Sequence, residues 1–182
     1  MAALQPPEPV KLVAALLGRD EDSLRAALAA LSERFGPIDH EGRAVPFDRT
    51  RYYEPEMGSS LERRVISFRG VRPTEALVEA KAAAVAIEDA LRGPSSGRRI
   101  NVDPGYMDYH KLVLASLKAG PMKVHLGGGI YADIIARWFD GAWRPTDWTF
   151  EDFRAGLYDA DLSAIRMRYR AEMAPARDKD RP

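Results

Sequence analysis

The chain has 182 residues, and its 27 lysines and arginines balance its 27 aspartates and glutamates. The zero net charge gives no overall attraction to nucleic acid or to an acidic membrane surface. The absence of cysteine excludes disulfides, thiolate nucleophiles and cysteine-ligated metal centres. No apolar run approaches the roughly 20 residues that cross a bilayer, and the N-terminus has no signal-peptide pattern. We therefore expect a cytoplasmic protein that makes no membrane contact.

Six segments in the first 103 residues carry strand or helix patterns. In chain order they are a strand at 10–18, a helix at 19–36, a short strand inside the long loop 38–60, a strand at 61–70, a helix at 73–93 and a strand at 95–103. Asp20 is the expected N-cap of the first helix. This order predicts an α+β fold with a ferredoxin-like βαββαβ core.

The second half of the chain is expected to extend that core. We predict a short helix at 109–118, then a hairpin at 122–139 whose strands are joined by glycines 127–129. A final amphipathic helix spans 159–173. One domain at 10–174 would then follow a flexible arm at 1–9 and precede a disordered tail at 175–182.

The step Asp103-Pro104-Gly105 matches a type II turn. In one interpretation Asp103 only caps this turn. In the other, Asp103 lies at a strand end beside a helix N-terminus, where free N–H groups hold an anion. Tyr106, His110 and Lys111 would then line a pocket.

The segment 47–58, with the sequence FDRTRYYEPEMG, mixes aromatic residues with both signs of charge. Long loops of this composition often bind ligands. Glu54 and Glu56 could join Asp103 as oxygen ligands for Mg²⁺, or one of the three could act as a general acid or base. The alternative is a solvated loop whose charges pair with one another and whose tyrosines pack on the sheet.

Three further patterns have weaker functional readings. The sequence GGGIYA at 127–132 fits the Gly-x-Gly-x-x-Ala dinucleotide pattern, but a strand follows it, so a hairpin turn is the better interpretation. The three tryptophans are most simply a hydrophobic cluster. The third pattern is a set of basic residues on predicted strands. They could bind RNA, but such residues are more typical of edge charges that keep a strand soluble. The set consists of Arg63, Arg64, Arg98, Arg99 and Lys123.

Five stretches in this order, FDRTRYYEPEMG, INVDPGY, KLVLAS, GGGIYAD and WTFEDF, resemble a small prokaryotic family catalogued as domain of unknown function 4416. The resemblance covers the chain from about Val10 to Tyr169 and implies a single domain, but no established activity. Gly128 stands where many relatives have a polar or acidic residue. The family's features fall here on Asp48–Thr50, Tyr52–Tyr53, Glu56–Gly58, Asn101, Asp103–Tyr106, Lys111 and Gly129–Asp133.

The leading hypothesis is a site for an anionic, phosphate-bearing small molecule such as a nucleotide. Asp103 and Glu56 would be the acid, the base or the Mg²⁺ ligands. The remaining roles are anion binding by Arg51, Lys111 and Lys123, and stacking or hydrogen bonding by Tyr53 and Tyr106. Hydrolysis or transfer at phosphorus is the reaction class that this arrangement favours.

Two rival hypotheses involve larger partners. The protein could be a non-catalytic module that binds RNA on an open sheet face or a protein through the aromatic loop. It could also be a homodimer whose interface contains Tyr52 and Tyr53.

Overall fold

The computed structural model describes residues 5–92 and 97–179, with side chains described up to residue 174. These residues form a single domain of mixed α and β structure, as the sequence predicts at the level of fold class. The described strands are β1 (Val10–Gly18), β2 (Ile38–Glu41), β3 (Val45–Pro46), β4 (Glu62–Arg72), β5 (Ile100–Met107), β6 (Lys111–Ser116), β7 (Val124–Gly127), β8 (Ile130–Phe139) and β9 (Ala142–Pro145). The described helices are α1 (Glu21–Phe35), α2 (Glu54–Met57), α3 (Ala76–Ala90), α4 (Glu151–Arg154) and α5 (Asp159–Lys179).

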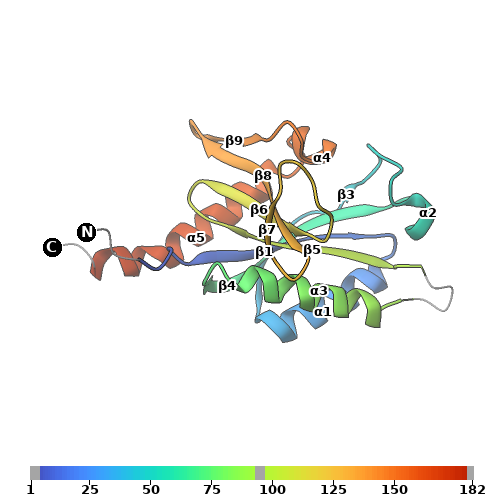
Figure 1. Ribbon diagram of the computed structural model, residues 1–182, viewed down its shortest axis with the longest axis horizontal. Helices are drawn as coiled ribbons and strands as arrows, with labels where there is room; N and C mark the ends of the chain where they lie inside the picture. Colours follow the sequence, from blue (N-terminus) through green and yellow to red (C-terminus); the bar gives the residue numbers. More distant parts are fainter. Residues whose placement is uncertain (1–4, 93–96, 180–182) are drawn as a thin grey trace.

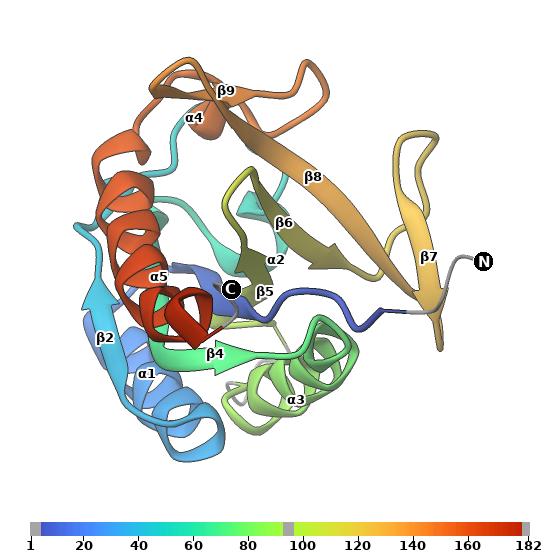
Figure 2. The ribbon, with the colours of Figure 1, turned by 90° about the vertical axis from the view of Figure 1, so that its left-hand side faces the viewer.

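The described strands belong to one sheet in the order β2-β4-β1-β5-β6-β8-β7. Strand β3 pairs with β4, and β9 pairs with β8. All of these pairings are antiparallel. In Figure 1, helices α1 and α3 lie together on one side of the sheet, whereas α5 and α4 lie on the other side. Figure 2 shows β8 crossing the molecule above β6 and carrying β7 and β9 near its two ends.

Strand β1 lies at the centre of the structure and is buried along its whole length. Leu12 and Leu16 pack in the core formed with α1 and α3. The intervening residues Val13 and Ala15 face the second core, which contains residues of α5. Because both faces are covered, the strand is continuously apolar from Leu12 to Leu17 instead of alternating.

Lys11 is the charged residue within β1, and its side chain is fully buried. The ammonium Nζ donates 2.8 Å hydrogen bonds to Asp39 on β2 and to Glu172 on α5, and a 2.9 Å bond to the Phe68 carbonyl. A buried charge is tolerated only when it is paired and hydrogen-bonded, so Lys11 joins the central strand to an outer strand and to the final helix.

The first helix begins as its sequence predicts. The Asp20 carboxylate accepts hydrogen bonds from the Ser23 backbone N–H at 2.8 Å and from the Ser23 hydroxyl at 2.7 Å. The helix ends at Phe35, and Gly36 follows with a positive φ of 92°. Ser and Asp side chains satisfy free N–H groups at a helix start, and glycine adopts the left-handed backbone with little cost.

Two predictions for residues 103–118 are wrong. Asp103, Pro104 and Gly105 are not a turn, because β5 continues through them and pairs with Ala15, Ala14 and Val13. Residues 111–116 form strand β6 and not part of a helix. The expected helix N-terminus beside Asp103, and the anion site built on it, therefore do not exist.

Gly105 has a packing role in place of the expected turn. A Cβ atom there would lie 2.1 Å from the Val113 carbonyl oxygen and 2.5 Å from the Leu114 side chain. Pairing between β5 and β6 starts at this residue, so Pro104 pairs with β1 but lies outside the β5–β6 ladder. The missing N–H of proline therefore removes no hydrogen bond to β6.

The glycines at 127–129 do join a hairpin, between β7 and β8, and all three have positive φ. Regular alternation along this strand would place Ile130, Ala132, Ile134, Ala136 and Trp138 on one face of β8, but the burial of the strand does not follow this pattern. The register between β6 and β8 shifts at Leu112/Val113, and as a result Ile135 is buried while Ile134 is 40% exposed.

The final helix is longer than predicted, because α5 continues to Lys179. Four residues that the sequence places on its apolar face are all buried: Leu162, Ile165, Tyr169 and Met173. The predicted arm and tail include residues 1–4 and 180–182, which lie outside the described residues. Their disorder stays a prediction.

Candidate functional site

The sheet separates between two neighbouring strands, and a cavity lies there. Strands β5 and β6 pair from Gly105 to Met107 with Leu112 to Leu114. Beyond Gly105 the two strands part, and Ala115 and Ser116 pair with β8 alone, whereas Leu112 to Leu114 pair with both β5 and β8. We call the space between residues 101–103 and residues 114–116 the fork.

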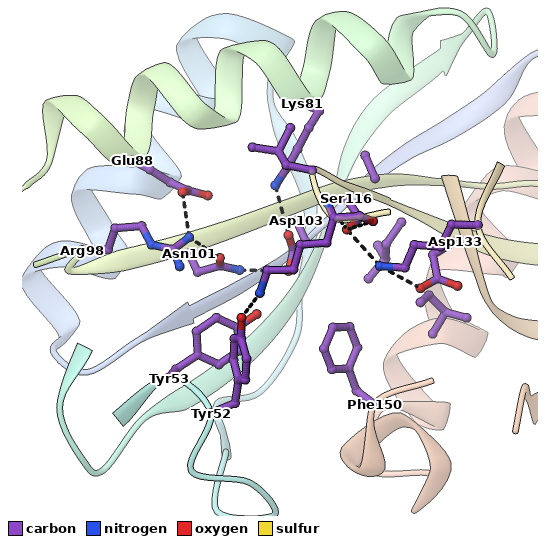
Figure 3. A pocket seen from close by; sticks show the side chains of 16 residues that line it. Tyr52, Tyr53, Lys81, Glu88, Arg98, Asn101, Asp103, Ser116, Asp133 and Phe150 are labelled. Carbon is purple, nitrogen blue, oxygen red and sulfur yellow. Dashed lines mark hydrogen bonds and ion pairs between the residues drawn. The ribbon is translucent and has the colours of Figure 1, made fainter. Parts of the chain in front are cut away.

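The fork contains a cavity of about 320 Å³. Figure 3 shows polar side chains from both branches pointing toward it. Its lining comes from segments far apart in the sequence: Tyr52, Tyr53, Lys81, Glu88, Arg98, Asn101, Asp103, residues 114–118, Lys123, Asp133, Ile135 and Phe150. A cavity of this size, with apolar walls and a few convergent polar groups, is typical of small-molecule sites.

Two side chains of α3 take the place of the missing strand beside β5. The Val102 N–H donates a 2.7 Å hydrogen bond to Glu88 Oε1, and Lys81 Nζ donates a 2.9 Å bond to the Val102 carbonyl. Lys81 and Glu88 are 4% and 5% exposed. Because buried backbone groups need partners, these side chains allow β5 to run on without β6.

Asp103 is bound on both carboxylate oxygens. Lys81 Nζ donates a 3.1 Å bond to Oδ1, and the Asn101 amide donates a 2.9 Å bond to Oδ2. The Asn101 amide oxygen in turn accepts a 2.8 Å bond from Arg98. Arg98 also contacts Glu88 at 3.2 Å, so one connected polar network lines the floor of the fork.

The network extends to the predicted binding loop. Arg98 donates two 2.7 Å hydrogen bonds to the Glu56 carboxylate, from Nε to Oε1 and from Nη2 to Oε2. Such two-bond arginine–carboxylate pairs are geometrically specific. This pair fixes α2, and with it Tyr52 and Tyr53, over the fork.

The environment shifts several pKa values in the network. The hydrogen bonds from Arg98 lower the pKa of Glu56, and the same bonds raise the pKa of Arg98. Burial raises the pKa of Glu88 in spite of its contact with Arg98. Burial, with a smaller contribution from the Asp103 charge, raises the pKa of Tyr53 to about 12, so this phenol stays protonated at neutral pH.

The mouth of the cavity carries two lysines from the segment between β6 and β7. Lys118 Nζ contacts the Tyr52 hydroxyl and lies 4.0 Å from the centre of the Tyr52 ring. Lys123 Nζ donates a 2.9 Å bond to the Ser116 hydroxyl and lies 3.5 Å from Asp133 Oδ2. The mouth therefore presents two cations: Lys118 contacts a neutral hydroxyl, and Lys123 contacts a neutral hydroxyl and pairs with the Asp133 carboxylate.

The structure brings together part of the predicted site. Asp103, Tyr53 and Lys123 all line the fork. Glu56 lies one contact away, through Arg98. Arg51 is an exposed residue that does not line this cavity.

Tyr106 and Lys111 belong to a different place. They line a separate cavity of about 240 Å³ together with His110, without Asp103. Lys111 is paired there with Asp108. The grouping of Tyr106, His110 and Lys111 predicted from the sequence therefore exists, but it is not part of the fork.

The predicted Mg²⁺ ligands do not converge. Within residues 5–92 and 97–179, no group of three histidines, aspartates or glutamates is placed to hold a metal ion. Glu56 is bound to Arg98, Asp103 is bound to Lys81 and Asn101, and Glu54 is exposed.

The basic strand residues do not form one RNA-binding face. Arg63 is 1% exposed and pairs with buried Asp152 at 2.6 Å, so the interpretation as a solubilising edge charge is wrong for it. Arg64 pairs with Glu21 and Glu41.

The predicted tryptophan cluster holds for two of its three members. The ring centroids of Trp138 and Trp143 are 5.4 Å apart. Trp148 is 44% exposed, and its indole N–H donates a 3.1 Å hydrogen bond to Asp133.

Sequence reasoning missed the two α3 residues that complete β5. Lys81 and Glu88 are seven residues apart and share the buried face of α3 with Leu77 and Ala84. Two opposite charges within the apolar face of a helix are an informative signal, because charged residues are almost never buried unless they are paired. Lys118 carried no comparable signal, because its position depends on how the strands separate.

Comparisons with known proteins identify the family of the chain. No helix in the described part of the chain is long and apolar enough to cross a membrane. No curated protein and no solved structure matched the chain. Residues 8–169 match the family described as Domain of unknown function (DUF4416), and the chain therefore belongs to this family.

Proposed function

We propose that the fork binds an anionic, phosphate-bearing small molecule. The observation that carries this proposal is the pair of lysines at the mouth. Lys118 and Lys123 line a cavity whose walls also contain aromatic rings from Tyr52 and Phe150. Flexible ammonium groups are common phosphate ligands, and aromatic walls suit a flat organic group.

The charge distribution supports an anion at the mouth and not on the floor. On the floor, Glu88 and Asp103 already pair with Arg98 and Lys81. At the mouth, the Lys118 contact is with a neutral tyrosine hydroxyl, and the Lys123–Asp133 distance is 3.5 Å. A phosphate would therefore gain charge-assisted hydrogen bonds from both lysines without breaking the network below.

If the site also catalyses a reaction of its ligand, Asp103 is the residue that we expect to take part in proton transfer. It is the carboxylate on the β5 branch of the fork, and Lys81 and Asn101 fix its orientation. The reaction class would be hydrolysis or transfer at phosphorus. Asp103→Asn should then abolish turnover while binding persists, because the mouth lysines stay in place.

The proposal is tested by a thermal-shift screen followed by calorimetry. Purified protein is screened against inorganic phosphate, sugar phosphates and nucleotides, with and without Mg²⁺. A ligand at about 100 times its dissociation constant adds roughly 2.7 kcal/mol of stability, which is a measurable shift. No shift with any phosphorylated compound would refute the proposal.

Matched lysine variants locate the ligand. Lys118→Met and Lys123→Met keep the apolar stems and remove the charges, so each should weaken binding about 10- to 100-fold, as expected for a lost charged hydrogen bond. Lys111→Met is the control, because Lys111 is paired with Asp108 in the other cavity. Equal losses in all three variants would place the ligand elsewhere.

A second candidate function is RNA binding outside the fork. Arg137 on β8 lies directly opposite Arg144 on β9, and both are exposed. Phe139, two residues further along β8, is 60% exposed and lies 5.4 Å from the Arg137 guanidinium. Like charges facing each other across strands are unfavourable, and an anionic backbone between them would relieve the repulsion.

The RNA function is tested by the salt dependence of binding to short single-stranded RNA. Arg137→Gln and Arg144→Gln should each reduce the salt dependence, because fewer counterions are released. Binding that these substitutions leave unchanged would exclude this face.

We infer that β1, α1, β2, β4, α3 and β5 form a ferredoxin-like unit at the finer level of topology. The strand order β2-β4-β1-β5, with both helices packed in one core, supports this inference. An experimental structure in which β2 pairs with a strand other than β4 would contradict it.

A further inference from the structure

A second, smaller cavity adjoins the fork. It has a volume of about 270 Å³ and shares Lys123, Asp133 and Phe150 with the larger cavity. Its own walls include Met122, Trp148 and Thr149. The two cavities therefore meet at the Lys123–Asp133 pair, which we call the partition.

One group in the smaller cavity lacks a partner. Thr149 is 8% exposed and its hydroxyl Oγ1 has no hydrogen-bond partner within the described residues. A buried hydroxyl without a partner costs stability, so such a group in a cavity wall indicates that something else supplies the bond. A hydroxyl both donates and accepts, and it can meet either kind of polar atom on a ligand.

The smaller cavity also has apolar walls from Met122 and Trp148. Trp148 and Met122 are 44% and 52% exposed, although large apolar side chains are usually buried. The Trp148 ring is held in position, because its indole N–H donates to Asp133. An indole whose N–H is held by a hydrogen bond and whose side chain is partly exposed can be a platform on which another ring stacks.

We propose that this smaller cavity holds the base of a nucleotide whose phosphate lies against Lys118 and Lys123. The inference rests on the proposed function of the fork and narrows its ligand from phosphorylated compounds in general to nucleotides. The base stacks on Trp148, and its polar edge meets the Thr149 hydroxyl. The ribose spans the partition, where Lys123 moves from Asp133 to the phosphate.

The first experiment compares ligands from which the base, and then the ribose, are removed. Calorimetry measures the binding of AMP, UMP, ribose 5-phosphate and inorganic phosphate to the wild-type chain. We expect the nucleotides to bind at least about tenfold more tightly than ribose 5-phosphate, because stacking alone is worth a factor of this order. Equal binding of ribose 5-phosphate and both nucleotides would overturn the base subsite and leave the phosphate proposal standing.

The second experiment removes the hydroxyl without changing the shape of its side chain. Thr149→Val should weaken nucleotide binding about fivefold and leave ribose 5-phosphate binding unchanged, since one neutral hydrogen bond is lost. Thr149→Ser keeps the hydroxyl and should retain nucleotide affinity. Wild-type nucleotide affinity in Thr149→Val would contradict the role of this residue.

The third experiment tests the platform. Trp148→Leu should lose about tenfold in nucleotide affinity, whereas Trp148→Phe keeps a ring and should lose less, even though both substitutions remove the bond to Asp133. Equal losses in the two variants would show that Trp148 acts through Asp133 and would refute stacking. If none of the four ligands binds the wild-type chain, the fork proposal and the base subsite fail together.

Discussion

Arg98 and Glu56 are 42 residues apart in the sequence and are joined by two hydrogen bonds of 2.7 Å. The contact lies beside a close backbone approach, since a Cβ atom on Gly97 would be 2.7 Å from the Glu56 carbonyl oxygen. These two features hold α2 against the segment that leads into β5. The loop that carries Tyr52 and Tyr53 is therefore part of the fork and not a free surface loop.

We expect Glu56→Gln to loosen this loop. The neutral amide cannot accept both arginine bonds, so amide hydrogens in residues 52–58 should exchange faster than in the wild type, as measured by mass spectrometry. Glu54→Gln, two residues earlier on the same short helix, is the control. Equal exchange in the wild type and Glu56→Gln would show that the pair does not hold the loop.

The same pair predicts a pH dependence. The folded-state pKa of Glu56 lies below its ordinary value of 4.5, because Arg98 favours the carboxylate. Its contribution to stability is therefore present above about pH 4.5 and is lost as the pH falls through the folded pKa. The stability advantage of the wild type over Glu56→Gln in urea should shrink over that acidic range. An advantage that stays constant with pH would contradict this assignment.

Glu88 should show the opposite dependence. Burial raises its pKa above the ordinary value of 4.5, so the folded protein holds this proton more tightly than the unfolded chain does. The resulting stability is present below pH 4.5 and is lost as the pH rises through the folded pKa. The stability of Glu88→Gln relative to the wild type should therefore increase as the pH rises above about 4.5. A relative stability that decreases over this range would show that Arg98 outweighs burial.

Gly105→Ala should strongly destabilise the fold. The new methyl group would collide with backbone, the Val113 carbonyl oxygen at 2.1 Å, and β5 would have to separate from β6. We expect a loss of about 3 kcal/mol or more, above the usual range for a single substitution, measured by urea denaturation. Gly120→Ala is the control, because its nearest contacts are at 3.5 Å on the flexible Lys123 side chain. A change of less than 1 kcal/mol in Gly105→Ala would show that the strands adjust easily.

Asp152→Ala should destabilise the protein by about 3–5 kcal/mol, because it leaves the Arg63 charge buried without its partner. Arg63 is enclosed by the rings of Phe47 and Phe150, with the guanidinium 4.4 and 4.7 Å from the ring centres. Tyr158→Phe, which removes a second bond to the same carboxylate, should cost less. The double variant Arg63→Met/Asp152→Leu should recover most of the loss in thermal unfolding, since no charge is then left buried. A double variant as unstable as Asp152→Ala would contradict this explanation.

The sequence predicts those elements whose local signals agree with their packing. Residues 10–18 form a strand buried on both faces, and the helix after Asp20 has both a cap and an apolar face. Local signals failed where tertiary pairing decides the structure. The DPG step has the composition of a turn, but β1 holds it extended, and a proline is tolerated there because β6 starts to pair at Gly105.

The candidate site was predictable only for those residues that local sequence signals identify. The chemistry of Asp103 and Tyr53 is visible in their sequence context, so both could be named in advance. Their partners depend on the separation of β5 from β6, which no local pattern encodes. The grouping of Tyr106 with Asp103 was wrong because both residues lie on the extended strand β5, where side chains three residues apart point to opposite faces of the sheet.

The buried ammonium of Lys11 has a consequence for the order of events during synthesis. Its partners Asp39 and Glu172 are separated from it by 28 and 161 residues. While the ribosome is still making the second half of the chain, the central strand has one of these two carboxylates and no helix over one of its faces. We expect nascent chains that stop before α5 to stay sensitive to protease around β1. Protection should appear in a single step when α5 emerges, so this protein would complete its fold late and as one unit.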